Sequence, residues 1–140
     1  CDMLEKYPAK IIIAWGEALD GNKKIYNWLL NNGYPELAAL SSAIHASRDA
    51  LNWLLEHEPR LAILSNAIDG EKHAISWLVK NQEELLLTFA DACNDDKKAK
   101  RWLAERNLQA LINIADKVFE ILKQQRHDRV DYHKIKFFKG

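Results

Sequence analysis

The stretch "DGNKKIYNWLLNNG" (residues 20–33) has the pattern of a short amphipathic helix with turn-forming residues at both ends. Related stretches follow it: "ASRDALNWLLEHEP" (46–59), "DGEKHAISWLVKNQ" (69–82) and "DDKKAKRWLAERNL" (95–108). Each contains a Trp-Leu pair, and the tryptophans lie 25, 24 and 25 residues apart, at Trp28, Trp53, Trp77 and Trp102. Spacing this regular indicates an internal repeat, which decides the fold before any other feature does.

A second apolar pattern precedes each of these helices. Alanine stands ten residues before every tryptophan, and a large apolar residue stands thirteen before, at Trp15, Leu40, Leu64 and Phe89. The spacing within this upstream pattern is helical. Each repeat is therefore predicted to contain two short helices, a first one called helix A and a second one, with the Trp-Leu pair, called helix B.

The residues between helix A and helix B fit a tight turn. Helix A is expected to end near Gly21, Ala46, Gly70 or Asp95, and glycine suits the left-handed residue after a helix. Helix B then begins at Asn22, Ser47, Glu71 or Asp96. All but Glu71 are favoured N-caps, because their short side chains accept hydrogen bonds from the first turn.

These patterns predict an all-α protein, a right-handed α/α solenoid of about 4.5 helix-hairpin repeats of 24–25 residues with a C-terminal cap. The expected helices are 8–20, 22–32, 35–45, 47–57, 59–69, 71–81, 83–93, 95–106 and 108–126. The repeat array is assigned to residues 1–126. Residues 127–140 are expected to form a capping or partly ordered basic tail within the same single domain, whose apolar residues, such as Val130 and Tyr132, could cover the open end of the stack.

The tryptophans of the B helices are interpreted as a buried column between the layers, because isolated helices of this length are marginal in water and need neighbours. A platform on which sugars or nucleic-acid bases stack is the alternative. Trp15 is also expected in the core, and Cys93, at an apolar repeat position, is expected to be a buried thiol.

The helix pairs resemble those of ankyrin repeats. "LSNAIDGEKHAISWLVKN" (64–81) has leucine, alanine, glycine and a Trp-Leu pair where that family has leucine, alanine, glycine and a double-leucine helix end. Ankyrin units are about 33 residues long and include a β-hairpin, for which 24 or 25 residues leave no room. The resemblance covers most of residues 12–106. It implies an ankyrin-like or other α-solenoid protein without β-hairpins, and protein–protein binding on the helix A side.

Composition and charge narrow the class of protein. The 140 residues are 48 % hydrophobic and 29 % charged, as in ordinary soluble domains. A formal net charge of zero argues against a dedicated nucleic-acid binder, which usually has a basic excess. No apolar run is long enough to span a membrane. A cytoplasmic location is expected; a mature lipoprotein anchored at Cys1 is the alternative.

One exposed face of the A helices is the candidate binding surface. Alignment of the repeats places on it small, polar and net acidic residues: Glu17, Asp20, Ser42, His45, Asn66, Asp69, Asp91, Asn94 and Asp116. The five acidic ones are expected to pair with nothing. This helix A face could be merely solvated, or it could form a groove for a basic or polar peptide.

The first turns of the B helices carry a second candidate surface, made of cations: Lys23, Lys24, Arg48, Lys72, Lys97, Lys98 and Arg101. Lysines beside the free amides of a helix start can bind anions. Interleaved acidic residues, such as Asp49 and Asp96, favour plain solubility instead. Binding of nucleic acid or another polyanion by this basic set is the alternative function.

No cofactor, metal ion or catalytic activity is expected. "DACNDD" (91–96) lacks the glycine and the terminal glutamate of a calcium loop. "HDRVDYH" (127–133) brings two histidines and two aspartates together, and is interpreted as tail. No nucleophile, base and orienting group can be assembled into one cleft. The sequence thus predicts a non-enzymatic module that binds another protein or peptide.

Overall fold

A computed structural model describes the backbone of residues 3–139 and the side chains of residues 3–128. Over that part of the chain there are nine α-helices and no strand. The helices are α1 Ala9–Leu19, α2 Lys23–Asn31, α3 Pro35–Ile44, α4 Arg48–His57, α5 Pro59–Ile68, α6 Lys72–Lys80, α7 Glu84–Cys93, α8 Lys97–Glu105 and α9 Gln109–Lys139. The odd-numbered helices are the predicted A helices, and the even-numbered ones are the B helices.

The turns from helix A to helix B have the predicted chemistry. The second residue after each of α1, α3, α5 and α7 has a positive φ: 95° at Gly21, 73° at Ala46, 85° at Gly70 and 66° at Asp95. One residue later, the side chains of Asn22, Ser47 and Asp96 accept a hydrogen bond from the third residue of the B helix. The expectation that Glu71 is a weak cap is wrong, because its two carboxylate oxygens accept from the amides of His73 and Ala74, both at 2.9 Å.

The B helices end in a second recurring arrangement. The residue four positions after each tryptophan donates a side-chain hydrogen bond to the tryptophan's carbonyl, from Asn32, His57, Asn81 and Arg106. These donors satisfy carbonyl groups that the last turn of a helix leaves unpaired. The ring of His57 also stacks on Trp53, with centroids 4.2 Å apart, and the guanidinium of Arg106 lies 3.6 Å from the ring centroid of Trp102.

The A helices form a closed ring. Successive A helices contact each other, and α1 also contacts α9. Trp15 of α1 meets Phe89 of α7 inside the ring, with ring centroids 5.8 Å apart. An open stack of layers would keep its first and last helices apart, so the contact between α1 and α9 departs from the arrangement expected from the sequence.

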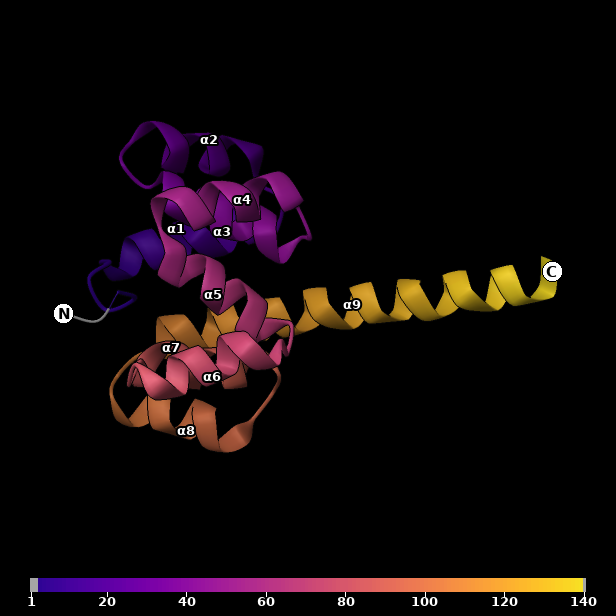
Figure 1. Ribbon diagram of the computed structural model, residues 1–140. Coiled ribbons are helices and arrows are strands. Elements are labelled where there is room, and N and C mark those ends of the chain that lie inside the picture. The colour runs from indigo at the N-terminus through magenta and orange to yellow at the C-terminus, as the bar shows by residue number, and fades with distance from the viewer. Residues whose placement is uncertain (1–2, 140) are drawn as a thin grey trace.

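Four of the five seams of this ring are covered by B helices. Helix α2 contacts α1 and α3, α4 contacts α3 and α5, α6 contacts α5 and α7, and α8 contacts α7 and α9. In the view of Figure 1, α2 and α4 lie on one side of the molecule and α6 and α8 on the other. Among the described helices, none covers the seam between α9 and α1.

The uncovered seam is closed by side chains. Lys117 of α9 stands where the other A helices have a buried alanine, and its ammonium group pairs with Asp20 of α1. Gly16 allows close approach here, because an added Cβ would lie 2.9 Å from Ile114 Cδ1. Ile13, on the same seam, is 61 % exposed. The seam is therefore sealed without a helix, by a salt bridge and a glycine contact.

The leucine of each Trp-Leu pair, rather than the tryptophan, lies in the core. Leu29, Leu54, Leu78 and Leu103 are all 0 % exposed. Trp28 is 43 % exposed, and the other B-helix tryptophans are half-buried. The predicted buried tryptophan column is thus wrong for these four residues, because adjacent helical residues point about 100° apart and only one can face the ring. Trp15 and Cys93 are fully buried, as expected.

Helix α9 is longer than the sequence indicated. It continues past residue 126 to Lys139, and its C-terminal part projects beyond the other helices in Figure 1. The segment expected to be a separate tail is therefore helical in continuity with the last A helix, except for Gly140, which lies outside the described residues. The side chains of residues 129–140, including the apolar ones expected to cover an end of the stack, also lie outside them.

Candidate functional site

The predicted helix A face lies where the A helices end and the B helices begin, and it divides into two sets. The first set directly follows the A helices, where Asp20, His45, Asp69 and Asn94 are the C-caps. The second set lies one turn earlier, at Glu17, Ser42, Asn66, Asp91 and Asp116. The two sets have different surroundings, because only the first touches the ends of neighbouring A helices.

The C-cap set is largely engaged in the fold. His45 donates from Nε2 to the carbonyl of Leu19 at 2.9 Å, and Asn94 donates to the carbonyl of Ile68 at 3.0 Å. In both cases the C-cap side chain of one A helix donates a hydrogen bond to the last carbonyl of the preceding A helix. The carboxylate side chain of Asp69 has no N–H to donate, and the carbonyl of Ile44 accepts instead from the side chain of Gln125 of α9, at 2.9 Å.

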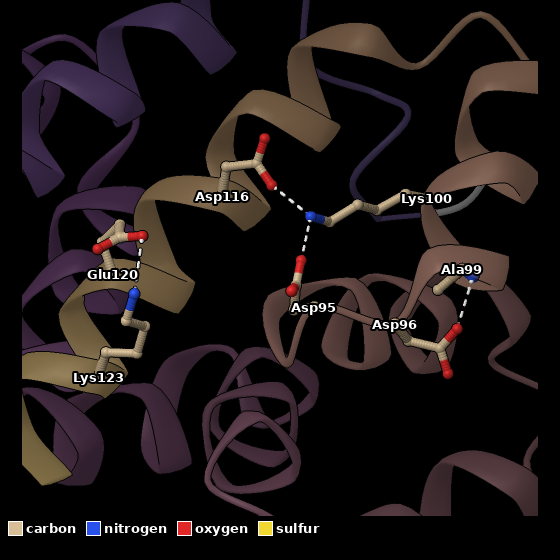
Figure 2. Close-up of polar contacts among 7 residues, drawn as sticks. All are labelled: Asp95, Asp96, Ala99, Lys100, Asp116, Glu120 and Lys123. Carbon is tan, nitrogen blue, oxygen red and sulfur yellow. Dashed lines mark hydrogen bonds and ion pairs between the residues drawn. The ribbon is translucent and has the colours of Figure 1, made fainter.

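Two further acidic residues of the face form ion pairs, although the sequence reasoning left them unpaired. Asp20 pairs with Lys117. Lys100 Nζ lies between Asp116 Oδ1 at 2.7 Å and Asp95 Oδ1 at 2.5 Å, as Figure 2 shows. The hydrogen bond from Lys100 holds the pKa of Asp95 below its usual value, and the two carboxylates raise the pKa of Lys100. The expectation that these residues pair with nothing is therefore wrong for Asp20 and Asp116.

The second set contains the members that face open space. Glu17 and Asp91 are exposed, and partial burial together with the charge of Asp96 raises the pKa of Asp91. Glu17 lines a hollow of about 370 Å³ at the seam between α1 and α9. Ser42 lines another hollow, of about 360 Å³, between α2 and α4. Most members of the helix A face are exposed, and two of them, Glu17 and Ser42, line these hollows.

The predicted basic set is exposed as expected. None of its seven residues forms a salt bridge within the part of the chain whose side chains are described. Acidic residues lie among these cations in the sequence: Asp49 is in the first turn of α4, and Glu71 and Asp96 are the N-caps of α6 and α8. Polyanion binding by the basic set stays a prediction.

The hollow between α2 and α4 has the most varied chemistry. Helix α3 forms its floor, and the lining residues are Tyr26, Leu30, Pro35, Ala39, Ser42, Ser47, Asp49, Ala50 and Trp53. Two are aromatic, and Asp49 is the one charged residue among them. The hydroxyl groups of Tyr26 and Ser42 are 2.8 Å apart and share a hydrogen bond. Ser47 Oγ accepts from the amide of Ala50 at 3.2 Å.

Two residues distinguish this hollow when the four Trp-Leu stretches and their upstream helices are aligned. Ala39 stands where the next copy of the pattern has Ile63, so its side chain is smaller by three carbon atoms. Asp49 stands where the other repeats have Lys24, His73 and Lys98. The hollow therefore combines a small floor residue with the one carboxylate at that position of the repeat. The alignment of repeats contained this signal, which the sequence reasoning missed.

Among the described residues, no group of three or more histidine, cysteine, aspartate or glutamate side chains is arranged to hold a metal ion. Within the same residues, no helix has the length and apolar character needed to cross a bilayer. Burial raises the pKa of the Cys93 thiol well above its usual range, with a smaller effect from Asp116. A thiol held protonated in this way is a poor nucleophile.

Comparison of the chain with protein-family models, with curated proteins and with solved structures gives no match. What can be stated of the class of protein therefore comes from the helices and their packing alone. Over the described residues it is an all-helical protein of consecutively packed helices. Its surface hollows lie between neighbouring elements of that packing.

Proposed function

We propose that the chain is a non-enzymatic protein–protein interaction module that binds a basic or polar segment of a partner protein. The hollow between α2 and α4 carries this proposal, because it joins a carboxylate, two aromatic side chains and a small polar floor in one groove. Grooves of about this volume suit a few side chains of a partner. Ser42, from the predicted helix A face, lies within it.

The proposal includes the architecture expected from the sequence. The chain is an ankyrin-like array of helical hairpins, of right-handed solenoid type with about 4.5 repeats, located in the cytoplasm. Closure of the A helices into a ring leaves no open concave side for a partner. The binding surface consequently moves from the whole helix A face to the grooves between B helices, where A-helix residues such as Ser42 form the floor.

A peptide-display selection tests this function. We expect the wild-type protein to enrich peptides rich in arginine and lysine, and the variant Ala39→Ile to bind them at least tenfold more weakly. This substitution fills the hollow with the residue that the next repeat carries at Ile63, so the fold should tolerate it. Ala104→Leu is the matched control, because it adds similar volume at an exposed position of α8.

Two results would contradict the proposal. One is a set of peptides whose binding is unchanged by Ala39→Ile. The other is binding that favours RNA or DNA over every peptide, falls steeply with salt, and is lost when the basic set is neutralised. The second result would favour the polyanion alternative.

A further inference from the structure

We infer that the hollow between α2 and α4 recognises a single arginine side chain of the partner segment. This inference rests on the proposed function and names the group that the groove selects. The starting observation is that Asp49, Trp53 and Tyr26 line one hollow of about 360 Å³. A guanidinium group is planar, always charged, stacks on aromatic rings and binds carboxylates through two hydrogen bonds.

The placement of the carboxylate and one aromatic wall follows from helix geometry. Asp49 and Trp53 are four residues apart on α4, so their side chains share one face of the helix. Tyr26 reaches the hollow from α2, and its hydroxyl is fixed by Ser42 of α3. Helices α2 and α4 both contact α3, and the three helices thus present one negative group and two aromatic side chains to the same space.

The molecule contains its own example of arginine on the equivalent tryptophan. The guanidinium carbon of Arg106 lies 3.6 Å from the ring centroid of Trp102. In α4 the corresponding residue is His57, which stacks on Trp53 with an interplanar angle of 15°. A flat cation can therefore stack on a tryptophan at this position. His57 already covers one face of the Trp53 ring, so the partner's arginine would meet the part of Trp53 that lines the hollow beside Asp49.

Charge complementarity selects a cation over other occupants. Asp49 is exposed, is the one charged residue among those that line the hollow, and forms no salt bridge within the described side chains. An apolar occupant would leave this carboxylate without a partner in the groove, and an anion would be repelled by it. A cationic and planar side chain satisfies the carboxylate and the aromatic walls together.

The test is a titration followed by amide chemical shifts. The probe is N-acetyl-arginine-N-methylamide, and the matched control is the same compound made from citrulline, which is a neutral isostere. We expect saturable shifts confined to residues around the hollow in α2, α3 and α4, with apparent affinity for arginine at least tenfold higher than for citrulline. The shifts should disappear in Asp49→Lys and in Ala39→Ile.

Asp49→Lys carries the residue that other repeats have at this position, so loss of binding there is not expected to reflect unfolding. Glu56→Lys makes the same change of charge on the same helix, outside the hollow, and should keep the arginine shifts. Equal binding of citrulline, shifts scattered over other acidic residues, or unchanged binding in Asp49→Lys would overturn the inference. If arginine fails in this way while selected peptides still require the open hollow, the proposed function stands and only the arginine assignment falls.

Discussion

The two residues of each Trp-Leu pair differ in burial, because the leucine packs in the core and the tryptophan lies at its edge. The leucine is fully buried in every repeat, while the tryptophan lies at the rim and shields the last turn of its helix. There the residue four positions later bonds to its carbonyl. The tryptophan is therefore at once a partial core residue and a surface residue.

This division predicts different effects of removing each side chain. Leu29→Ala should lower the free energy of unfolding by about 2–5 kcal/mol, because it leaves a cavity in the core. Trp28→Ala should cost roughly half of that or less, since 43 % of its surface is already exposed. Denaturant unfolding followed by circular dichroism measures both. A larger loss for Trp28→Ala would contradict the observed burial.

The buried thiol gives a second prediction at this scale. In a Cys1→Ser variant, iodoacetamide should fail to label Cys93 in the native protein at pH 7 to 8.5, because its raised pKa keeps the thiol protonated and burial blocks access. Labelling should follow unfolding in guanidinium. Mass spectrometry reports the modified fraction, and rapid modification of native protein would disprove the burial of this residue.

Helix ends could be predicted well from the sequence because the turns are determined by local chemistry. The residues named as turn positions all have positive φ, and the predicted helices from 8–20 to 95–106 differ from the observed ones by at most two residues at each end. The 24-residue spacing also has a local cause. The link from α4 to α5 lacks the left-handed residue that Gly33, Gln82 and Asn107 provide at the other three links.

One turn offers a test by substitution. Ala46 has a φ of 73°, where a Cβ is unfavourable and glycine is not. Ala46→Gly should therefore stabilise the protein by roughly 1 kcal/mol, while the reverse change at the equivalent position, Gly70→Ala, should destabilise it by a similar amount. Thermal unfolding of the two variants checks the signs. Shifts in the same direction for both would show that the turns differ in conformation.

The salt bridges of Lys100 link two elements, α8 and α9, and their contribution should depend on pH. Asp95 has a lowered pKa, so its contribution is present above its unfolded value and is lost as the pH falls below 3.8 and through the folded pKa. Lys100 has a raised pKa, so its contribution is lost only as the pH rises above 10.5. The stabilisation by the Lys100 salt bridges is therefore fully present at neutral pH.

Lys100→Met should accordingly lower the melting temperature at pH 7, and the difference from wild type should shrink toward pH 2. Lys98→Met is the control, because Lys98 is exposed on the same helix and forms no salt bridge among the described side chains. A difference that persists unchanged in acid would mean that Lys100 acts by packing alone.

Closure of the ring could not be predicted from repeat spacing, because the rotation from one layer to the next depends on three-dimensional packing. The signal in the sequence is a substitution that breaks the pattern, since Lys117 replaces the alanine of the other A helices. Its pairing with Asp20 requires α9 to lie beside α1, and that neighbour is not visible in single repeats.

Only part of the candidate site could be predicted from the sequence, because the site also depends on three-dimensional packing. Ser42 was placed on the exposed face and does line the hollow. The sequence alone gives Asp49 only the role of an acidic residue among the basic set, and gives Ala39 no role. Their importance depends on the packing of α2 and α4 on α3, which brings residues from three elements around one space.

The whole account depends on contact between the first and last A helices, since closure moves the binding surface to the grooves between B helices. The most direct measurement is chemical cross-linking of a double variant, Ile13→Cys with Asn113→Cys, in a Cys1→Ser background. Both residues line the hollow at the seam between α1 and α9. Ile13→Cys with Val79→Cys, at the exposed Val79 of α6, is the control pair. Closure predicts that a short bis-maleimide links residues 13 and 113 within the monomer and does not link the control pair. Efficient labelling of both thiols without any intrachain link between 13 and 113 would contradict the closed ring.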